Sequence, residues 1–403
     1  MITIFVLCSC QTKPKKWTSD DLIISDQVSL NFAEKLSANQ AAEDIDFLIF
    51  ALSNGYGGRK YVPGDSFSKA ITALKDISKQ ATMAEFHDRI DESLFIIPDN
   101  HMAAYYMGNV SKKRSEQKQL DVGHVGANNI KDPNKFWETR IDRVGKKKVL
   151  YISITEFPDR QSEEWTGFIP SASALKKNAD AIVIDLRGNI GGDDTKGMEL
   201  AQLLFGHPFE HPISKQYRSQ TAETLALAVT KNKVQIINKK IQKLQIPPYL
   251  ENGLDNTKEQ YNLALSGQLP PEYIRTDKGG GKRSDPVTGF KKPIYILMDR
   301  ACSSSCEFTI AAFEWNKYVT KVGENTNGTF HFSNAGMVVL PNSKIKVSIP
   351  TQYSEYYDHR FIERIGLKPE IKVSEGDDAY EVTKKVLNGQ KSGPFSSSLE
   401  NHE

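Results

Sequence analysis

Three consecutive serines, Ser303 to Ser305, stand between Cys302 and Cys306 in the stretch MDRACSSSCEFTIAAFEW. The apolar run before them and the amphipathic run after them predict a strand, a tight turn and a helix that begins near Cys306. At such a helix start, free backbone N–H groups can hold an oxyanion while a hydroxyl attacks a carbonyl. The turn could therefore support acyl transfer by a serine nucleophile. A serine run is also a common helix N-cap, so the motif alone leaves both interpretations open.

The elements that would position this turn lie in the second half of the chain, which we predict to form an α/β core over residues 147–390. Short apolar runs alternate there with amphipathic stretches, a pattern typical of strands covered by helices on both faces. One of these runs ends in the glycine-rich turn DLRGNIGG. Residues 207–285 interrupt the pattern with Lys-, Gln- and Asn-rich sequence, which predicts a helical cap insertion. Residues 391–403 are expected to be a flexible tail.

The first part of the chain, residues 18–110, is expected to be a helical domain that ends in the segment around His101. Apolar residues at helical spacing stop at Asn54-Gly55, and Thr82 answered by Glu85 predicts a capping box. A short strand should follow His101. Residues 111–146 are polar and are predicted to be a linker.

The N-terminus resembles a bacterial lipoprotein signal, because the apolar run MITIFVL is followed by CSC before the chain becomes polar. Residues 1–17 would then be signal and tether, with Cys10 as the lipidated residue. This predicts a protein anchored to the membrane of the bacterial cell envelope and facing the periplasm. The alternative is a buried N-terminal strand with two idle thiols.

Composition excludes several functional classes. The 403-residue chain has a formal net charge of +2, and its Lys and Arg residues are scattered, so we expect no nucleic-acid partner. A zinc site is not supported, because no second cysteine pair or nearby paired histidine exists. We expect neither a metal nor a cofactor. Cys302 and Cys306 could be bridged or could be two packed thiols; the spacing leaves this open.

Five segments occur in the order found in the tail-specific, or carboxyl-terminal processing, serine peptidases, and the chain resembles that family over about 147–206 and 292–373. They are VLYISITEF, IVIDLRGNIGG, ILMDRACSSSCEF, KVGENTNG and ERIGLKPEI. The resemblance implies a crotonase- or ClpP-like spiral β/α core. It also implies a peptide or unfolded protein as substrate.

The resemblance implies roles for the serine turn and the glycine-rich turn. The family's nucleophile lies three residues before a Glu, here Glu307, so the matching residue is Ser304. Ser303 would support it, and the Ser305 amide would be one oxyanion donor. The second donor would come from Gly191 or Gly192, where the missing side chain lets the backbone approach a substrate. Asp185 and Arg187 are expected to be structural, fixing the loop through an ion pair.

The chain departs from the family at the general base. Most members carry a lysine in a GExxxGK segment, whereas GENTNGTF here places Thr329 at that position. The protein is therefore inactive or uses another base. The tricorn-like branch of the family uses a histidine and a carboxylate, and the matching residues are His101 as base and Glu363 as the group that orients it. Asn100 would be a supporting relay residue.

Each of these assignments has an alternative. His331 is the rival base, because it would lie on the same side of a strand as Thr329. Glu363 could instead be a surface carboxylate, and Asp99 is expected to shape its turn. The stretch before the core is too short and polar for the family's PDZ domain, so the 207–285 insertion is the expected gate to the site.

We therefore expect a serine-type peptidase that works through an acyl-enzyme with a Ser-His-Glu arrangement. An inactive ligand- or peptide-binding module on the same core is the alternative, since loss of the lysine is what such a module would show. A crotonase-type acyl-CoA enzyme is a weaker third hypothesis, against which the serine turn and the GENTNG segment argue.

Overall fold

The structure is a computed structural model, and it describes the larger part of the chain in several ranges. These are residues 16–23, 31–77, 81–120, 123–128, 130, 135–158, 163–206, 213–219, 225, 262–263, 266, 268, 272–275 and 289–390. The predicted signal with Cys10, most of the 207–285 insertion and the 391–403 tail lie outside them.

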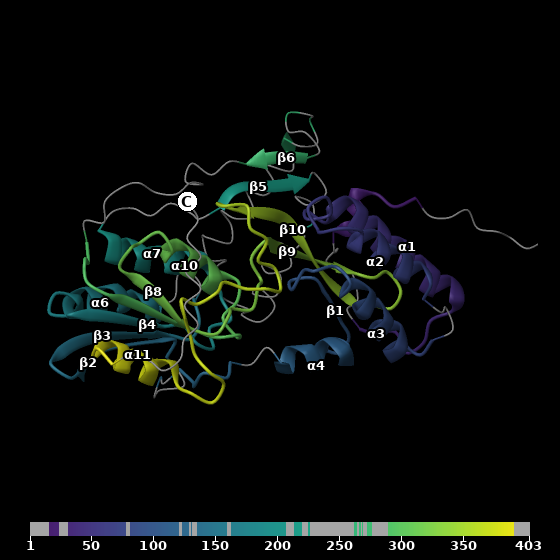
Figure 1. Cartoon of the computed structure of the whole chain (residues 1–403). Coiled ribbons are helices and arrows are strands. Elements are labelled where there is room, and N and C mark those ends of the chain that lie inside the picture. The colour runs from purple at the N-terminus through teal and green to yellow at the C-terminus, as the bar shows by residue number, and fades with distance from the viewer. Residues whose placement is uncertain are drawn as a thin grey trace, which may run out of the picture.

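A six-stranded sheet forms one end of the molecule, with its strands in the order β11-β8-β7-β4-β3-β2 (Figure 1). Its strands are β2 (Trp137–Val144), β3 (Lys147–Ile154), β4 (Ala181–Asp185), β7 (Ile294–Met298), β8 (Val319–Gly323) and β11 (Ile371–Lys372). All neighbours pair in parallel except β2, which runs antiparallel to β3. Parallel pairing brings the carboxyl ends of β4 and β7 to the same edge, where the glycine-rich turn and the serine turn follow them.

Both faces of this sheet are covered, as the apolar strands predict. On β3, Leu150 and Ile152 belong to the apolar core under helices α6 (Phe168–Lys176), α7 (Asp194–Phe205) and α10 (Ser305–Phe313). The alternate residues Val149 and Tyr151 face a second core completed by α11 (Ala379–Leu387). Figure 1 shows α11 on the opposite side of the sheet from the other three helices. The predicted α/β fold class is thus confirmed.

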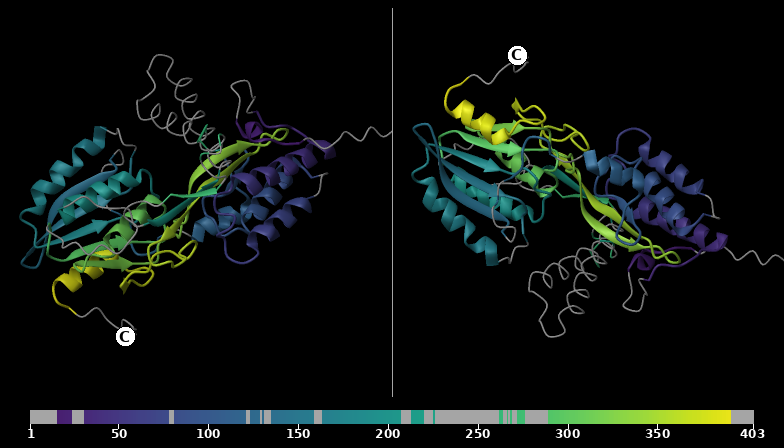
Figure 2. Two further views of the ribbon diagram at one scale, coloured as in Figure 1. Left: turned by 90° about the horizontal axis from the view of Figure 1, so that it is seen from above. Right: turned by 90° about the horizontal axis from the view of Figure 1, so that it is seen from below.

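A second sheet is organised around the long strand β10 (Lys346–Tyr356), which pairs with β9 (Phe332–Val339), β1 (Ala103–Tyr105) and β5 (Ile213–Ser219). Strand β6 (Glu272–Arg275) pairs with β5. The N-terminal helices pack on this sheet in a shared apolar core, at the far end of the molecule from the first sheet (Figure 2). They are η1 (Ser19–Leu22), α1 (Ala38–Gly55), α2 (Ser66–Lys75) and α3 (Met83–Leu94).

Local signals set the ends of these helices. The Glu85 amide lies 3.3 Å from Thr82 Oγ1, and Glu85 Oε2 accepts the Thr82 amide at 2.9 Å, which is the predicted capping box. Helix α1 ends at Gly55, as predicted. None of the described helices has the length and apolar character needed to cross a membrane.

Two parts of the fold differ from the predictions. Residues 111–146, expected to be a linker, contain helix α4 (Lys112–Leu120) and the edge strand β2. The sequence WETRIDRV hides this strand because charged residues occupy much of it, with Arg140 paired to Glu138 and Asp142. The described parts of the 207–285 insertion include the strands β5 and β6, where helices were expected. A short helix, α5 (Glu163–Thr166), also precedes α6.

Candidate active site

Ser304 is the N-cap residue of α10, directly after the turn that leaves β7. Its backbone angles are φ +55° and ψ −120°, a region that residues with a Cβ rarely adopt. Such a conformation costs on the order of 1–3 kcal/mol and persists only where the surroundings fix it. The serine-run turn is therefore more than a helix cap, because an ordinary N-cap has extended backbone angles.

The glycine-rich turn lies against the serine turn. Ser303 donates its amide to Asn189 O at 3.1 Å, and the Ser305 hydroxyl donates to Gly192 O at 2.6 Å. Gly191 has φ +105°, and a Cβ added there would approach the Ser304 Cβ to 3.0 Å. Glycine at 191 is thus required both by the backbone angle and by the closeness of Ser304, the predicted nucleophile.

The three expected oxyanion donors are not equivalent. The Gly191 N–H donates to Asn189 Oδ1 at 2.8 Å and so is already engaged. Within the described part of the chain, the N–H groups of Gly192 and Ser305 have no acceptor. The hydrogen bond between Ser305 Oγ and Gly192 O keeps these two residues together. Gly192 and Ser305 are accordingly the pair available to hold an oxyanion.

Asn189 is a positioning residue that the sequence did not single out. Its amide Nδ2 donates to Ile154 O at 3.1 Å, its Oδ1 accepts the Gly191 amide, and its carbonyl accepts the Ser303 amide. It therefore ties the end of β3 to both turns. Its position inside the DLRGNIGG motif is the sequence feature that could have identified it.

The ion pair expected at the start of this loop is present. The Arg187 guanidinium donates to both carboxylate oxygens of Asp185, at 2.9 and 2.6 Å, and both side chains are fully buried. Asp378 accepts from the same guanidinium at 2.9 Å. These contacts fix the loop and leave both groups unavailable for chemistry.

Glu307 links the serine turn to the GENTNGTF segment. Its buried carboxylate accepts the backbone amides of Ser304 at 3.3 Å, Gly328 at 2.8 Å and Thr329 at 2.6 Å, and the Thr326 hydroxyl. Burial raises the pKa of Glu307, and these four donors oppose that rise. Glu307 thus holds the turn of Ser304, the predicted nucleophile, against this segment. Thr329 occupies the family's lysine position and has no amine, so it cannot act as a base.

His331, the rival base, has both ring nitrogens occupied. Its Nδ1 lies 2.8 Å from Ser354 O, and its Nε2 accepts the Ile362 amide at 2.9 Å. The buried ring stacks on Phe361 with centroids 4.8 Å apart. Because its only lone pair already accepts an amide, His331 cannot take a proton from a serine without breaking the loop that it holds.

His101 differs from His331 in the hydrogen bonding of its ring nitrogens. Its Nδ1 is buried, without a hydrogen-bond partner in the part of the chain that the structure describes. Burial lowers the pKa of His101 to about 4, opposed by a hydrogen bond with the Phe332 backbone. The imidazole is therefore neutral at pH 7, as a base must be. No hydrogen bond joins it to Ser304 among the described residues.

The backbone around His101 is nonetheless attached to the site. Asn100 donates its side-chain amide to Asn327 Oδ1 at 2.9 Å and Gly328 O at 3.1 Å, beside the amide bound by Glu307. Asp99 Oδ1 accepts the His101 amide at 2.9 Å. Asp99 therefore shapes its turn as expected, and Asn100 ties the histidine segment to the loop next to Ser304.

Glu363 is not a surface carboxylate, since only 2% of it is exposed. It accepts the backbone amides of Asn100 at 3.0 Å, Phe330 at 3.0 Å and His331 at 2.9 Å. Burial and the nearby Asp99 carboxylate raise the pKa of Glu363 well above its usual value. Its contacts among described residues go to the backbone next to His101 rather than to the imidazole, so it can act on the predicted base by positioning that backbone.

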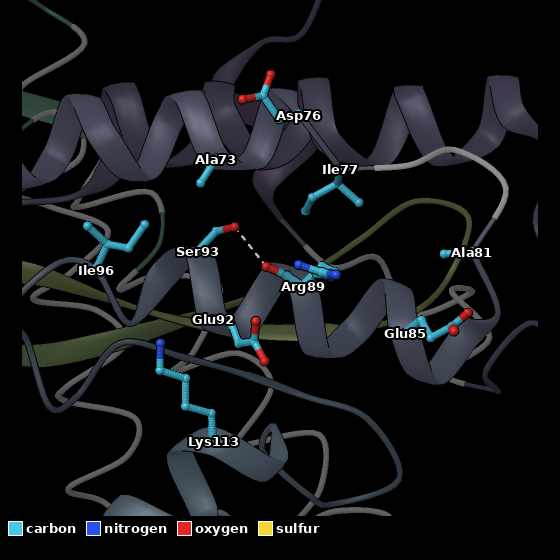
Figure 3. A pocket seen from close by; sticks show the side chains of 10 residues that line it. All are labelled: Ala73, Asp76, Ile77, Ala81, Glu85, Arg89, Glu92, Ser93, Ile96 and Lys113. Carbon is cyan, nitrogen blue, oxygen red and sulfur yellow. Dashed lines mark hydrogen bonds between the residues drawn. The ribbon is translucent and has the colours of Figure 1, made fainter.

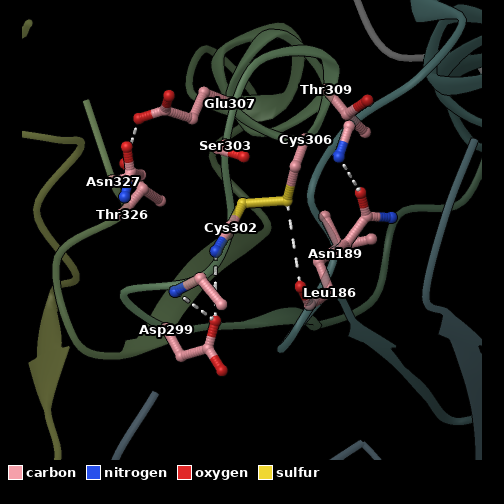
Figure 4. Close-up of a disulfide and its surroundings, with 12 residues drawn as sticks. Leu186, Asn189, Asp299, Cys302, Ser303, Cys306, Glu307, Thr309, Thr326 and Asn327 are labelled. Atoms are coloured by element: carbon pink, nitrogen blue, oxygen red, sulfur yellow. Dashed lines mark hydrogen bonds between the residues drawn. A yellow bond between two sulfur atoms is a disulfide. The ribbon is translucent and has the colours of Figure 1, made fainter. Parts of the chain in front are cut away.

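Cys302 and Cys306 are bridged by a disulfide whose Cα atoms lie 5.6 Å apart, and Figure 4 shows it beneath the serine turn. The spacing alone could not decide this. The described residues hold no cluster of His, Cys, Asp or Glu that could bind a metal.

A cavity of about 370 Å³ opens beside the serine turn. It is lined by Phe95, Asn100, Arg114, Gln117, Ile190, Ala301, Ser303, Asn327 and Thr329. Ile190, in the glycine-rich turn, is 69% exposed at this cavity. A larger cavity of about 740 Å³ lies between α2 and α3, with Arg89 and Lys113 at its side, but no predicted catalytic residue lines it (Figure 3). Of these two cavities, the smaller one therefore lies next to the predicted catalytic residues.

Comparisons with known proteins show which proteins share this fold. A solved structure of a candidate peptidase from Parabacteroides merdae is 13% identical, with a TM-score of 0.55, and the match covers 88% of this chain and 97% of the other. Mature CPAF in complex with lactacystin gives 14% identity and a TM-score of 0.55, with 88% and 99% covered. At these identities the likeness establishes the fold.

A Chlamydia pneumoniae protein is 24% identical over 226 residues, which are 53% of this chain and 36% of that relative. The chain thus spans about a third of that relative's length. The family model for Peptidase family S41 matches residues 148–373. Because that match covers more than half of the chain and includes both turns of the site, the chain belongs to Peptidase family S41, the tail-specific serine peptidases.

Proposed function

We propose that this protein is an active serine peptidase, which hydrolyses peptide bonds in peptide or unfolded protein substrates through an acyl-enzyme on Ser304. The observation that carries the proposal is the conformation of Ser304, held at φ +55° beside the N–H groups of Gly192 and Ser305, which have no acceptor among the described residues. A turn that served only to cap a helix would need neither the strained backbone nor the neighbouring glycines.

The proposed roles follow the chemistry of each group. Ser304 Oγ attacks the scissile carbonyl while the neutral His101 imidazole takes its proton, and the Gly192 and Ser305 amides hold the oxyanion. His101 then gives the proton to the leaving amine, and later activates the water that hydrolyses the acyl-enzyme. Glu363 accepts the Asn100 amide and so positions the segment that carries His101. The contact between His101 and Ser304 is expected to form in the substrate complex.

The cavity beside Ser303 supports a substrate side-chain subsite. It lies between the serine turn and Asn100, and Ile190 offers exposed apolar surface to an occupant. Arg114 contributes a positive charge to the lining of this cavity, but its Nε already donates to both carboxylate oxygens of Asp91 at 3.0 Å. The subsite therefore favours an uncharged substrate side chain.

The test is covalent labelling with a fluorophosphonate probe, followed by mass spectrometry of the labelled peptide, in parallel with hydrolysis of an unfolded protein substrate. We expect the label on Ser304, none in Ser304→Ala, and a rate about 10²–10⁴ times lower in His101→Ala. Ser303→Ala is the matched control, since it removes a neighbouring hydroxyl from the same turn. Labelling of Ser303 instead, or equal hydrolysis by all variants, would refute the assignment.

One observation favours a second candidate, an inactive peptide-binding module. Thr329 replaces the family's lysine, and the resting structure has no hydrogen bond from His101 to Ser304 among the described residues. A folded wild-type protein that binds peptides but takes no label would support this function over the peptidase.

We also propose that Cys10 carries a lipid that anchors the protein in the bacterial cell envelope, on its periplasmic side. The support is the apolar run before CSC in residues 1–10. Metabolic labelling with an alkyne fatty acid should mark the wild-type protein and not Cys10→Ala, with Cys8→Ala as the control. An unlabelled wild type in the soluble fraction would contradict the anchor.

A further inference from the structure

We propose that the Cys302–Cys306 disulfide is a positioning element for the Ser304 nucleophile, and that its loss lowers turnover without weakening substrate binding. The inference rests on the proposed function, because it concerns how that same serine is held. The bridge spans the segment whose central residue is Ser304, and its two Cα atoms are 5.6 Å apart.

Each half of the bridge is attached to a different part of the site (Figure 4). The Cys302 amide is held by Asp299 at the end of β7, and the Cys302 carbonyl accepts the Asn327 amide at 2.8 Å. Cys306 belongs to α10, and its sulfur lies 3.8 Å from Leu186 O, next to the glycine-rich loop. The bridge therefore fixes the distance between the strand end and the helix while Ser304 arches between them.

Side-chain hydrogen bonds hold the residues on either side of Ser304, and the Ser304 carbonyl accepts the Phe308 amide at 3.1 Å at the start of α10. Ser303 Oγ donates to Ile190 O at 3.0 Å and Ser305 Oγ to Gly192 O at 2.6 Å, whereas among the described residues the Ser304 amide makes one longer bond, of 3.3 Å, to Glu307. Without the cross-link, Cys302 and Cys306 could separate and let Ser304 relax from its positive φ. That movement would carry the hydroxyl away from the Gly192 and Ser305 amides.

The position of the bridge argues for a local role. Stabilisation through the unfolded chain grows with the length of the loop that a disulfide closes, and this loop is only four residues in sequence separation. Both cysteines are fully buried in the apolar core under α10, so the bridge is not a surface tether. Its effect should therefore appear at the nucleophile rather than in global stability.

The experiment compares three proteins, all carrying Cys8→Ala and Cys10→Ala so that only this pair of thiols remains. They are the otherwise wild-type chain, Cys302→Ala with Cys306→Ala, and the matched control Ile310→Val. Ile310 is a fully buried residue of the same helix, and its change removes a comparable small apolar volume without touching the turn. Intact mass after alkylation, with and without a dithiol reductant, establishes whether the bridge is present.

We expect the double variant to lose roughly tenfold or more in kcat and in the rate of fluorophosphonate labelling, since small displacements of a reacting atom have large effects on rate. Its KM should stay within about twofold of the parent, because the substrate-binding surface is unchanged. Its melting temperature should fall no further than that of Ile310→Val.

Three results would overturn the inference. They are free thiols in the folded parent, equal labelling rates in parent and double variant, or a loss of kcat that a matching fall in melting temperature explains. If the parent labels normally and the double variant labels equally fast, only the disulfide's role is refuted. If the parent does not label at all, the proposed function fails and the positioning role fails with it.

Discussion

Asn100 and Glu363 lie 263 positions apart in the sequence and are joined by a 3.0 Å hydrogen bond from the Asn100 amide to Glu363 Oε1. This contact ties the segment that carries His101, at the edge of the helical domain, to the C-terminal part of the peptidase core. The same carboxylate also holds the amides of Phe330 and His331. Glu363 is therefore one of the buried acids that place the segment of the proposed base, together with Asp99, which accepts the His101 amide.

Replacing Glu363 by Gln should move the base and weaken the fold. One of the two terminal atoms of Gln is a donor, so it must face an N–H where the carboxylate accepted one. We expect a fall of at least roughly tenfold in kcat, and a loss of about 2 kcal/mol in unfolding free energy. Denaturant titration and peptide hydrolysis measure the two. Glu381→Gln, at an exposed carboxylate, is the control and should change neither.

Replacing Glu307 by Gln should slow the reaction of Ser304, the proposed nucleophile. The Glu307 carboxylate binds four donors, including the Ser304 and Thr329 amides on one oxygen. An amide group in its place leaves at least one buried N–H without an acceptor, which costs about 1–3 kcal/mol. Labelling at Ser304 should slow in the fraction that remains folded. Unchanged labelling would mean that Glu307 serves only stability.

His331 should prove a structural residue whose effect depends on pH. Burial lowers its pKa from 6.5 to about 4 in the folded protein, whereas the unfolded chain keeps the ordinary value. Between about pH 4 and 6.5 the unfolded state binds a proton that the folded state does not, so this residue's contribution to stability rises with pH across that window.

The prediction is that His331→Gln, which cannot titrate, loses more stability relative to the wild type at pH 7 than at pH 4.5. Denaturant unfolding at both values tests it, and the wild-type comparison cancels other groups such as Asp99, whose burial raises its pKa to about 7. A difference independent of pH would contradict the buried, neutral ring.

As the pH is lowered, the rate of Ser304 labelling should fall only at a pH well below the ordinary pKa of histidine. Because burial lowers the pKa of His101 to about 4, the base stays unprotonated as the pH falls from 8 to about 5 and is lost only near pH 4. A pH profile of labelling in a protein shown to be folded at each pH measures this. A midpoint near 6.5 would mean that the imidazole leaves its buried position before it acts.

Ile190→Ala should affect substrate binding alone. Ile190 lines the cavity beside Ser303 and exposes 69% of its surface, so a substrate side chain can cover it. Losing that apolar contact should raise KM roughly fivefold. Labelling by a small probe, which does not reach the cavity wall, should be unchanged. Ile365→Ala truncates another exposed isoleucine outside that wall and is the control.

The sequence by itself determined the local parts of this protein. Period and capping decided where the helices and the buried strands lie, because those signals come from neighbours along the chain, as Thr82 and Glu85 show. The order of five motifs indicated the family and the two turns that face each other. The edge strand β2 was not predicted, because its charged residues pair along the strand and leave no alternation of apolar and polar residues.

Only the tertiary structure decided which histidine keeps a ring nitrogen without a partner among the described residues, which glycine amide lacks an acceptor there, and whether the cysteines are bridged. His331 and His101 are indistinguishable as residue types, and they differ because Ile362 and Ser354 occupy one ring while the Nδ1 of the other has no partner among the described residues. Such differences arise from hydrogen bonds and burial between segments that are far apart in the chain. The local sequence pattern cannot predict them, because each depends on which distant residues the fold places next to the side chain or amide in question.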